Sequence, residues 1–323
     1  MTRHLFPAAL SLAAMIAAAP ALAETWQMSA HDPDGNFHTE NVRLFAEDVA
    51  EKSGGALTLD VKSNAVLLSR TDLKRGVQRG VVPIGEVLIS ALANEDPIYA
   101  ADNVPGLATT FEEAKALWDA SKPVYEAKLA EEGMMVLWSE PWPPQGIYMK
   151  EPIESAADLQ GVKFRAYSPT TARFAELLGA VPATVASGEI GQAFSTGLIS
   201  GMLTSPTTGV DSQAWDFVNH YYDVKAFIPK NFVLVNKAAF DALPPESQKA
   251  LTDAAAEAET RGWQMAQEAT EKATATLQEN GMEVHEAPEA LAADLAKVGD
   301  TMRDEWIAAG NDGVNAIVDA YQK

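Results

Sequence analysis

The sequence predicts an α/β fold of two domains, and three observations lead to it. Short apolar stretches with the two-residue period of strands alternate with longer stretches of helical period through the first half of the chain. Hydrophobic residues make up 47% of the 323 residues, which is enough for a substantial core. About 300 residues remain after an N-terminal leader, and a chain of that length usually divides into two domains.

The N-terminus has the pattern of a secretory signal peptide, which we expect to span residues 1–23. A short basic start precedes an apolar run over residues 5–19, and Ala21-Leu22-Ala23 fits a cleavage site. The run is too short and too rich in alanine for a good membrane span, and no later segment reaches about 18 unbroken apolar residues. We therefore expect a periplasmic protein that does not insert into the membrane, with a retained N-terminal anchor as the alternative.

Composition excludes several classes of protein. The formal net charge is −21, which disfavours binding to nucleic acid or to anionic membrane surfaces. An anionic ligand must therefore be held by local positive charge that works against the field of the whole chain. Cysteine is absent, which excludes thiol catalysis and cysteine-ligated zinc or iron–sulfur clusters and is compatible with the periplasm.

The elements follow in order from these periodicities. Strands of the first domain are expected over residues 25–30, 56–61, 81–89 and 134–138, and its helices over 38–52, 68–80 and 111–132. Residues 142–146, Trp-Pro-Pro-Gln-Gly, have the prolines and glycine of a passage between domains. The later elements are a strand at 147–149, a return to the first domain around 232–236, a long helix over 244–278, and helices over 289–310 and 314–321.

The most informative stretch is residues 159–206, because it places an arginine where α/β proteins bind ligands. Residues 161–166 are expected to form a strand with Arg165 near its carboxyl end, and Ser168 and Pro169 open the next helix as N-cap and first residue. Ligands of open α/β sheets bind at that end of the strands. The guanidinium offers a two-pronged grip on a carboxylate, with a structural salt bridge as the alternative.

Several motifs along the chain belong together. The central block reads DLQGVKFR at 158–165 and LGAVP at 178–182, followed by Glu189, Ala193, Thr196-Gly197 and Gly201. Weaker echoes are FAE at 45–47, SGG at 53–55, NFVLVNK at 231–237, FD at 240–241 and LPPESQ at 243–248. The sequence thereby resembles the solute-binding proteins of tripartite ATP-independent periplasmic (TRAP) transporters, the DctP-like family.

The resemblance implies a two-lobed periplasmic binding protein fold, with crossing connections, a cleft between the lobes and a long helix that braces both. It places residues 24–143 and 232–270 in lobe I, and residues 144–231 and 271–323 in lobe II. It further implies an extracytoplasmic receptor that captures a small organic acid and delivers it to the membrane permease subunits of a TRAP transporter.

The resemblance also implies which residues hold the ligand. Arg165 occupies the position of an arginine that pairs with the ligand carboxylate. Gln145 stands where the family often carries a second arginine, and since its amide supplies no charge, a ligand with one carboxylate is favoured. Thr204 or Ser205 falls near a third contact and could donate a hydroxyl, or cap the helix that follows.

Other candidates are chosen from their place beside the expected cleft. Trp142 and Tyr148 would suit a ring or a bulky apolar group of the ligand, and burial in the core is the alternative. Glu86, at a strand end, could balance a ligand ammonium and so select a zwitterion, or face outward.

Three more candidates lie on segments that we expect to point at the cleft or to connect the domains. Phe37 and His38 lie between the first strand and the first helix, and His38 could make binding sensitive to pH. Asn231, on the returning passage, either contacts the ligand or serves in the hinge.

Motifs for catalysis and metal binding are missing from the sequence. It lacks G-x-S-x-G, H-E-x-x-H, a P-loop and a G-x-G-x-x-G that follows a strand, and His31, His38, His220 and His285 have no ligand spacing. We therefore expect a receptor, not an enzyme, without cofactor or metal, for a monocarboxylate with an aromatic or bulky apolar part. A C4-dicarboxylate or a zwitterion is the alternative ligand, and a secreted hydrolase or a periplasmic sensor is the alternative function.

Overall fold

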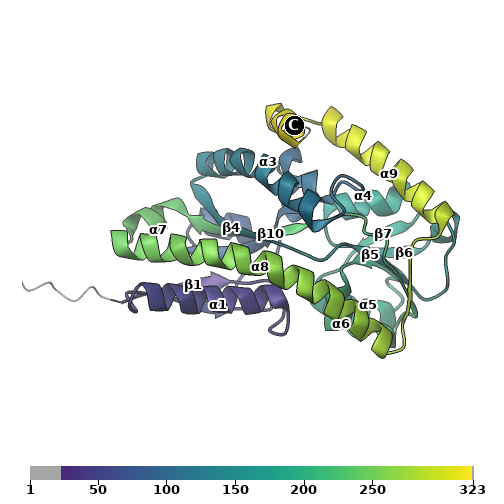
Figure 1. The fold of residues 1–323 in the computed structure, drawn as a ribbon, viewed down its shortest axis with the longest axis horizontal. Helices are drawn as coiled ribbons and strands as arrows, with labels where there is room; N and C mark the ends of the chain where they lie inside the picture. Colours follow the sequence, from purple (N-terminus) through teal and green to yellow (C-terminus); the bar gives the residue numbers. More distant parts are fainter. Residues whose placement is uncertain (1–22, 322–323) are drawn as a thin grey trace, which may run out of the picture.

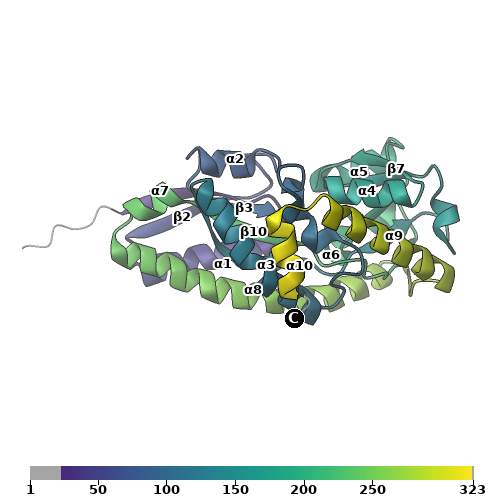
Figure 2. The ribbon, with the colours of Figure 1, turned by 90° about the horizontal axis from the view of Figure 1, so that it is seen from above.

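Two α/β lobes are joined by crossing segments and by one long helix. A computed structural model describes residues 23–321, so the expected leader at residues 1–23 lies outside the described residues except for its last residue. Figure 1 shows helix α8 (Pro245–Glu279) running along both lobes, and Figure 2 shows the same arrangement from above. The expected α/β class, with two lobes and a long helix, is confirmed.

The first lobe is built on a mixed sheet of five strands. These are β1 (Glu24–Ser29), β2 (Leu57–Lys62), β3 (Ile84–Leu88), β4 (Met134–Pro141) and β10 (Lys230–Asn236). Their order is β2-β1-β3-β10-β4. Strand β1 pairs in parallel with β2 and β3, whereas β10 runs antiparallel to β3 and β4, so the chain returns to this sheet as the sequence predicted.

The second lobe is built on a mixed sheet of six strands. These are β5 (Gly146–Met149), β6 (Lys163–Ala166), β7 (Val181–Thr184), β8 (Gly201–Thr204), β9 (His220–Tyr222) and β11 (Glu283–His285). Their order is β11-β9-β5-β8-β6-β7. Strand β6 pairs in parallel with β7 and β8, so the strand that carries Arg165 lies inside the sheet and holds this side chain rigidly.

Helices cover both sheets. They are α1 (Phe37–Lys52), α2 (Leu73–Gln78), α3 (Phe111–Glu131), α4 (Pro169–Leu177), α5 (Ile190–Ser195), α6 (Pro206–Asp211), α7 (Lys237–Ala242), α8, α9 (Glu289–Ala308) and α10 (Asp312–Tyr321). Figure 2 shows α10 beside α3, against which it packs. The division of the chain into lobes at residues 143 and 270 stays a prediction. No helix within residues 23–321 combines the length and the apolar character that crossing a membrane requires.

Helix α8 packs closely because one of its faces carries small residues. Residues 250, 254, 258, 262 and 266 are alanine or glycine at four-residue spacing, and all are buried. At Gly262 a Cβ would lie 2.7 Å from Asn41 Nδ2 and 2.8 Å from Glu140 Cδ, so glycine lets the helix approach these two residues. The 35 residues of α8 extend about 52 Å, which is enough to reach along both sheets.

Two segments cross between the sheets beside the long helix. Trp142 N donates to Pro229 O at 2.8 Å, and Gln145 N donates to Phe227 O at 3.0 Å. These backbone hydrogen bonds tie the passage between β4 and β5 to the return between β9 and β10. A hinge motion of the lobes would therefore bend both segments together.

Candidate ligand-binding site

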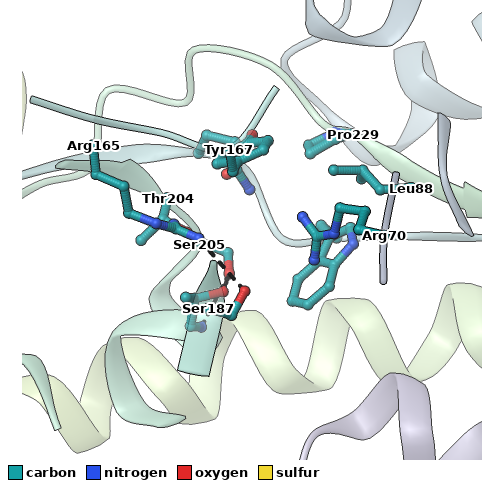
Figure 3. Close-up of a pocket in the computed structure, with 11 residues that line it drawn as sticks. Arg70, Leu88, Arg165, Tyr167, Ser187, Thr204, Ser205 and Pro229 are labelled. Carbon is teal, nitrogen blue, oxygen red and sulfur yellow. Dashed lines mark hydrogen bonds between the residues drawn. The ribbon is translucent and has the colours of Figure 1, made fainter. Parts of the chain in front are cut away.

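A cavity of about 270 Å³ lies where the crossing segments meet the strand ends of the two sheets. It is lined by Arg70, Leu88, Trp142, Gln145, Arg165, Tyr167, Ser187, Thr204, Ser205, Thr208 and Pro229. Figure 3 shows Arg165 and Arg70 reaching into it from opposite sides. The lining combines two cations, several hydroxyls and an apolar wall, and among the described residues it includes no aspartate or glutamate.

Arg165 is held in place by neutral oxygen atoms. Its side chain leaves the carboxyl end of β6 and is 1% exposed. Nε donates to Val185 O at 3.0 Å, and the two terminal nitrogens lie 3.4 Å from Thr204 Oγ1 and 3.5 Å from Ser187 Oγ. Within residues 23–321 the guanidinium forms no salt bridge, so the structural ion pair that was the alternative is not formed by the described residues.

The surroundings of Arg165 make the cavity electrostatically positive. Burial, with a smaller contribution from the charge of Arg70, lowers the pKa of Arg165 to about 9, although Tyr167 and Asp32 act in the opposite direction. At neutral pH the guanidinium therefore keeps its charge. Burial of this charge is unfavourable, and the charge has no acidic partner among the described residues. An anion that entered the cavity would supply that partner.

Arg70 is a second cation that the sequence analysis missed. The helix expected over residues 68–80 begins only at Leu73, because Ser69 Oγ donates to Asp72 Oδ2 at 2.6 Å in a preceding turn. Arg70 is left on this loop, with a terminal nitrogen 3.0 Å from His31 Nδ1 and 3.7 Å from Asp32 Oδ1.

Asp32 offsets part of the charge that Arg70 brings. Burial alone would raise the pKa of Asp32, but the hydrogen bond and charge of His31 and the charge of Arg70 lower the pKa to about 2. Asp32 is therefore ionised at neutral pH, and the positive charge of Arg70 is partly compensated before any ligand arrives.

Gln145 and Tyr167 form a hydrogen-bonded pair above Arg165. Tyr167 Oη donates to Gln145 Oε1 at 3.0 Å, and Gln145 Nε2 donates to Pro143 O at 2.8 Å. The guanidinium of Arg165 lies 5.5 Å from the ring centroid of Tyr167, within the range of a cation–π contact. Gln145 thus orients Tyr167, and Tyr167 in turn covers Arg165.

The remaining walls are one end of a helix and an apolar surface. Ser205 caps α6, since its Oγ accepts from Thr208 N at 3.1 Å, and it lines the cavity as well. The apolar surface consists of Trp142, Leu88 and Pro229. Trp142 Nε1 donates away from the cavity to Asn231 Oδ1 at 2.9 Å, which fixes the plane of the indole.

Comparison with known proteins identifies the family. Residues 28–308 match the family described as DctP, bacterial extracellular solute-binding protein, family 7. The chain belongs to this family. It is therefore a periplasmic, extracytoplasmic TRAP solute receptor and not an enzyme.

Solved structures of relatives are similar to this DctP-family receptor over nearly its whole length. DctP7 of Bordetella pertussis, described as binding pyroglutamic acid, is 51% identical with a TM-score of 0.92, and the match covers 93% of this chain and 100% of that one. A TRAP solute-binding protein from a marine metagenome, solved with co-purified pyroglutamate, is 37% identical with a TM-score of 0.91 and coverage of 93% and 99%. The C4-dicarboxylate-binding periplasmic protein DctP of Rhodobacter capsulatus is 28% identical over 252 residues, which are 74% of each chain.

The receptor brings half of its ten sequence-selected residues to the cavity. Those that line it are Arg165, Gln145, Thr204, Ser205 and Trp142. The others, which do not appear in the lining, are Tyr148, Glu86, Phe37, His38 and Asn231. Whether any of the ten contacts ligand stays a prediction.

Tyr148 supports the cavity from the core. Its side chain is fully buried, and its Oη donates to Ser205 O at 3.0 Å. Gly209 of α6 lies directly against the phenol, where a Cβ would come within 2.2 Å of Tyr148 Oη. Tyr148 thus holds the beginning of α6, with its capping Ser205, at the edge of the cavity.

Behind Trp142 lies a buried cluster of His38, Glu86 and Glu140. His38 Nδ1 is 3.3 Å from Glu86 Oε1 and 3.3 Å from Glu140 Oε2. Asn231 connects this cluster to the cavity wall, because its Nδ2 donates to Glu86 Oε1 at 3.0 Å while its Oδ1 accepts from Trp142. Glu86 therefore has protein partners behind the wall and is not part of the cavity lining.

His38 is the cation that holds this cluster together. Burial lowers its pKa, but the charges and hydrogen bonds of Glu140 and Glu86 outweigh burial and raise the pKa to about 10. The ring also packs against Trp142 and Phe37, with centroid separations of 4.2 Å and 4.3 Å. The cluster thus fixes one side of the cavity wall from behind.

Proposed function

We propose that this receptor captures pyroglutamate, or a cyclic monocarboxylate of similar size, and delivers it to the permease subunits of a TRAP transporter. The observation that carries the proposal is the buried guanidinium of Arg165, which lacks an acidic partner among the described residues and faces a cavity without acidic lining. Relatives at 51% and 37% identity that are described as binding pyroglutamate support the same ligand class.

The ligand carboxylate would lie against Arg165. The guanidinium is already oriented by Val185 O, and the Thr204 and Ser187 hydroxyls stand beside its terminal nitrogens. A carboxylate in this position accepts charge-assisted hydrogen bonds from nitrogen and hydroxyl donors together. Arg70 adds attraction from the opposite side of the cavity.

The lactam ring of pyroglutamate matches the rest of the lining. Its methylene groups would pack on Trp142, Leu88 and Pro229, and this contact would remove apolar surface of both the ring and the wall from water. Its amide is neutral but both donates and accepts hydrogen bonds, for which Ser205 and Thr208 offer hydroxyls.

A C4-dicarboxylate is the second candidate ligand, because Arg70 supplies the second cation that Gln145 does not. Asp32 at 3.7 Å already offsets part of that charge, which favours one carboxylate over two. A zwitterion is disfavoured more strongly, since Glu86 is hydrogen-bonded to Asn231 behind the wall.

Binding would shift the receptor toward its closed form. The cavity is lined from both lobes and from the crossing segments, so a ligand contacts all of these parts only when the lobes are together. Its preference for the closed form then sets how far the balance moves. Closure also excludes water from the ion pair with Arg165, which strengthens that pair.

Calorimetric titration with four matched ligands tests the proposal. Pyroglutamate is compared with 2-pyrrolidone, which lacks the carboxylate, with proline, which has an ammonium in place of the lactam, and with succinate. We expect pyroglutamate to bind tightest, pyrrolidone at least about 100-fold weaker, and proline about 10–100-fold weaker. Stronger binding of succinate would establish the dicarboxylate candidate, and equal binding of pyrrolidone would overturn the role of Arg165.

A further inference from the structure

A second cluster of ligating side chains lies at the edge of the second sheet, on strands that do not reach the cavity. The short strands β9 and β11 run in parallel, with Glu283 opposite His220 and His285 opposite Tyr222. The side chains of His220, His285 and Glu283 gather on one face of this pair. The cavity lining includes none of these residues.

The donor atoms of this cluster have the spacing of a metal site. His220 Nδ1 lies 3.0 Å from His285 Nε2, and Glu283 Oε2 lies 3.6 Å from the first nitrogen and 3.7 Å from the second. The nearest point equidistant from the three atoms lies in their plane, about 2.0 Å from each, which is the bond length of Zn²⁺ to imidazole nitrogen and to carboxylate oxygen.

The surroundings hold the imidazoles in this arrangement. The ring of His285 stacks on Tyr222, with centroids 4.8 Å apart and planes 24° apart. Tyr222 is itself fixed, because its Oη accepts from Ile153 N at 2.8 Å. His220 is 10% exposed, so its ring has little freedom to turn, whereas Glu283 is 67% exposed and leaves an approach from solvent.

We propose that His220, His285 and Glu283 bind one divalent transition-metal ion of the zinc type, with a fourth position open to water. Two imidazoles and one carboxylate suit zinc, nickel and copper better than magnesium or calcium, which prefer oxygen ligands. The ion joins β11, the strand that follows α8, to β9. It therefore fastens the end of the long helix to the second sheet.

The expected consequence is stabilisation of that edge without a change in solute binding. Strand β11 forms a ladder of three residue pairs at the edge of its sheet, and a short edge ladder contributes little by itself. A metal that binds the folded receptor but not the unfolded chain adds RT ln(1 + [metal]/Kd) to the free energy of unfolding, so the unfolding temperature rises with metal concentration. The ligand cavity is lined by other residues, so affinity for pyroglutamate should not change.

Zinc titration of the receptor, purified without a histidine tag and stripped with a chelator, tests the proposal. We expect one Zn²⁺ per chain by calorimetry and elemental analysis, and a Co²⁺ complex with the visible absorption of a nitrogen–oxygen site of low coordination number. His285→Ala should weaken zinc binding by at least about 100-fold, because losing even an outer partner of a ligand costs about 10–100-fold. Glu283→Gln should weaken it by about 10-fold.

Glu286→Gln is the matched control, since it removes the same charge from an exposed neighbour outside the triangle. It should keep the zinc affinity of the unmodified receptor. Circular dichroism and pyroglutamate titration establish that each variant is folded. Zinc binding that persists in His285→Ala, or that is lost equally in Glu286→Gln, would overturn the site, as would the absence of saturable binding in the unmodified receptor.

Discussion

Replacing Arg165 by methionine tests whether its guanidinium binds the ligand or stabilises the fold. Methionine fills a similar volume without charge, so the variant removes the cation with little loss of packing. If Arg165 binds the ligand, its unpaired charge destabilises the ligand-free receptor, and removing the charge should raise the free energy of unfolding. If it serves the fold, the same change should destabilise the receptor.

The magnitude follows from the surroundings of the guanidinium. Arg165 is 1% exposed, and its pKa of about 9 lies more than three units below the ordinary value, so its buried charge costs roughly 5 kcal/mol at neutral pH. Because the depressed pKa belongs to the folded state, the cost is present at neutral pH and disappears only as the pH rises above about 9.

The lost hydrogen bonds act in the other direction. Val185 O loses its donor and the Thr204 and Ser187 hydroxyls lose weaker partners, at about 1 kcal/mol each. We therefore expect Arg165→Met to raise the free energy of unfolding of the ligand-free receptor by about 2 kcal/mol. It should also weaken pyroglutamate binding by at least about 100-fold, since a bidentate charge-assisted pair is lost.

Urea unfolding with and without pyroglutamate measures both effects in one experiment. The unmodified receptor should gain about 2.7 kcal/mol when the ligand is present at a hundred times its Kd, and the variant, whose Kd is at least about 100-fold higher, should gain no more than about 0.4 kcal/mol at that concentration. A ligand-free variant destabilised by several kcal/mol would refute the reasoning, because the guanidinium would then be structural. Arg173→Met, at an exposed salt bridge with Glu305, is the matched control and should change ligand binding little.

Two further predictions concern the second cation and the buried histidine. Arg70→Gln should weaken pyroglutamate binding about 10-fold in calorimetry, which is less than the effect of Arg165→Met, because Asp32 already offsets part of the charge of Arg70. A larger loss of affinity in Arg70→Gln than in Arg165→Met would contradict this ranking. The folded-state pKa of His38, raised from 6.5 to about 10, contributes stability that is complete below pH 6.5 and is lost as the pH rises toward 10. Between pH 7.5 and 9 the unmodified receptor should lose about 2 kcal/mol more of its unfolding free energy than His38→Gln, and equal losses in urea unfolding would disprove the role of His38.

The cavity also explains how a strongly acidic protein can hold an anion. The net charge of −21 repels a carboxylate at long range, but salt at physiological concentration screens that field beyond about 8 Å. Inside the cavity the nearest charges are Arg165 and Arg70, and the acidic side chains nearby are paired, Asp32 with Arg70 and Glu86 with His38. Local arrangement therefore decides the sign of the field that the ligand meets.

The sequence by itself determined the features that depend on residues close together in the chain. The alternation of strands and helices set the α/β class, and a stretch of helical period with few helix-breaking residues over 244–278 predicted the long helix that packs along both lobes. Arg165 was found because a strand end followed by the cap Ser168-Pro169 fixes which end of the sheet its side chain leaves. These signals depend on neighbours in the chain, so no knowledge of distant segments was needed.

Only the tertiary structure decided which side chains face the cavity and which meet one another. Arg70 and Tyr167 line the cavity without any motif, whereas Glu86 and Asn231 turn to buried partners. Spacing along the chain gave no sign of a metal site, yet parallel pairing of β9 with β11 brings the nitrogens of two distant histidines within 3.0 Å. The physical reason is the same in each case. A strand or loop presents side chains on both of its sides. Segments from elsewhere in the chain then pack against it and determine which of these side chains are buried, paired or left in the cavity.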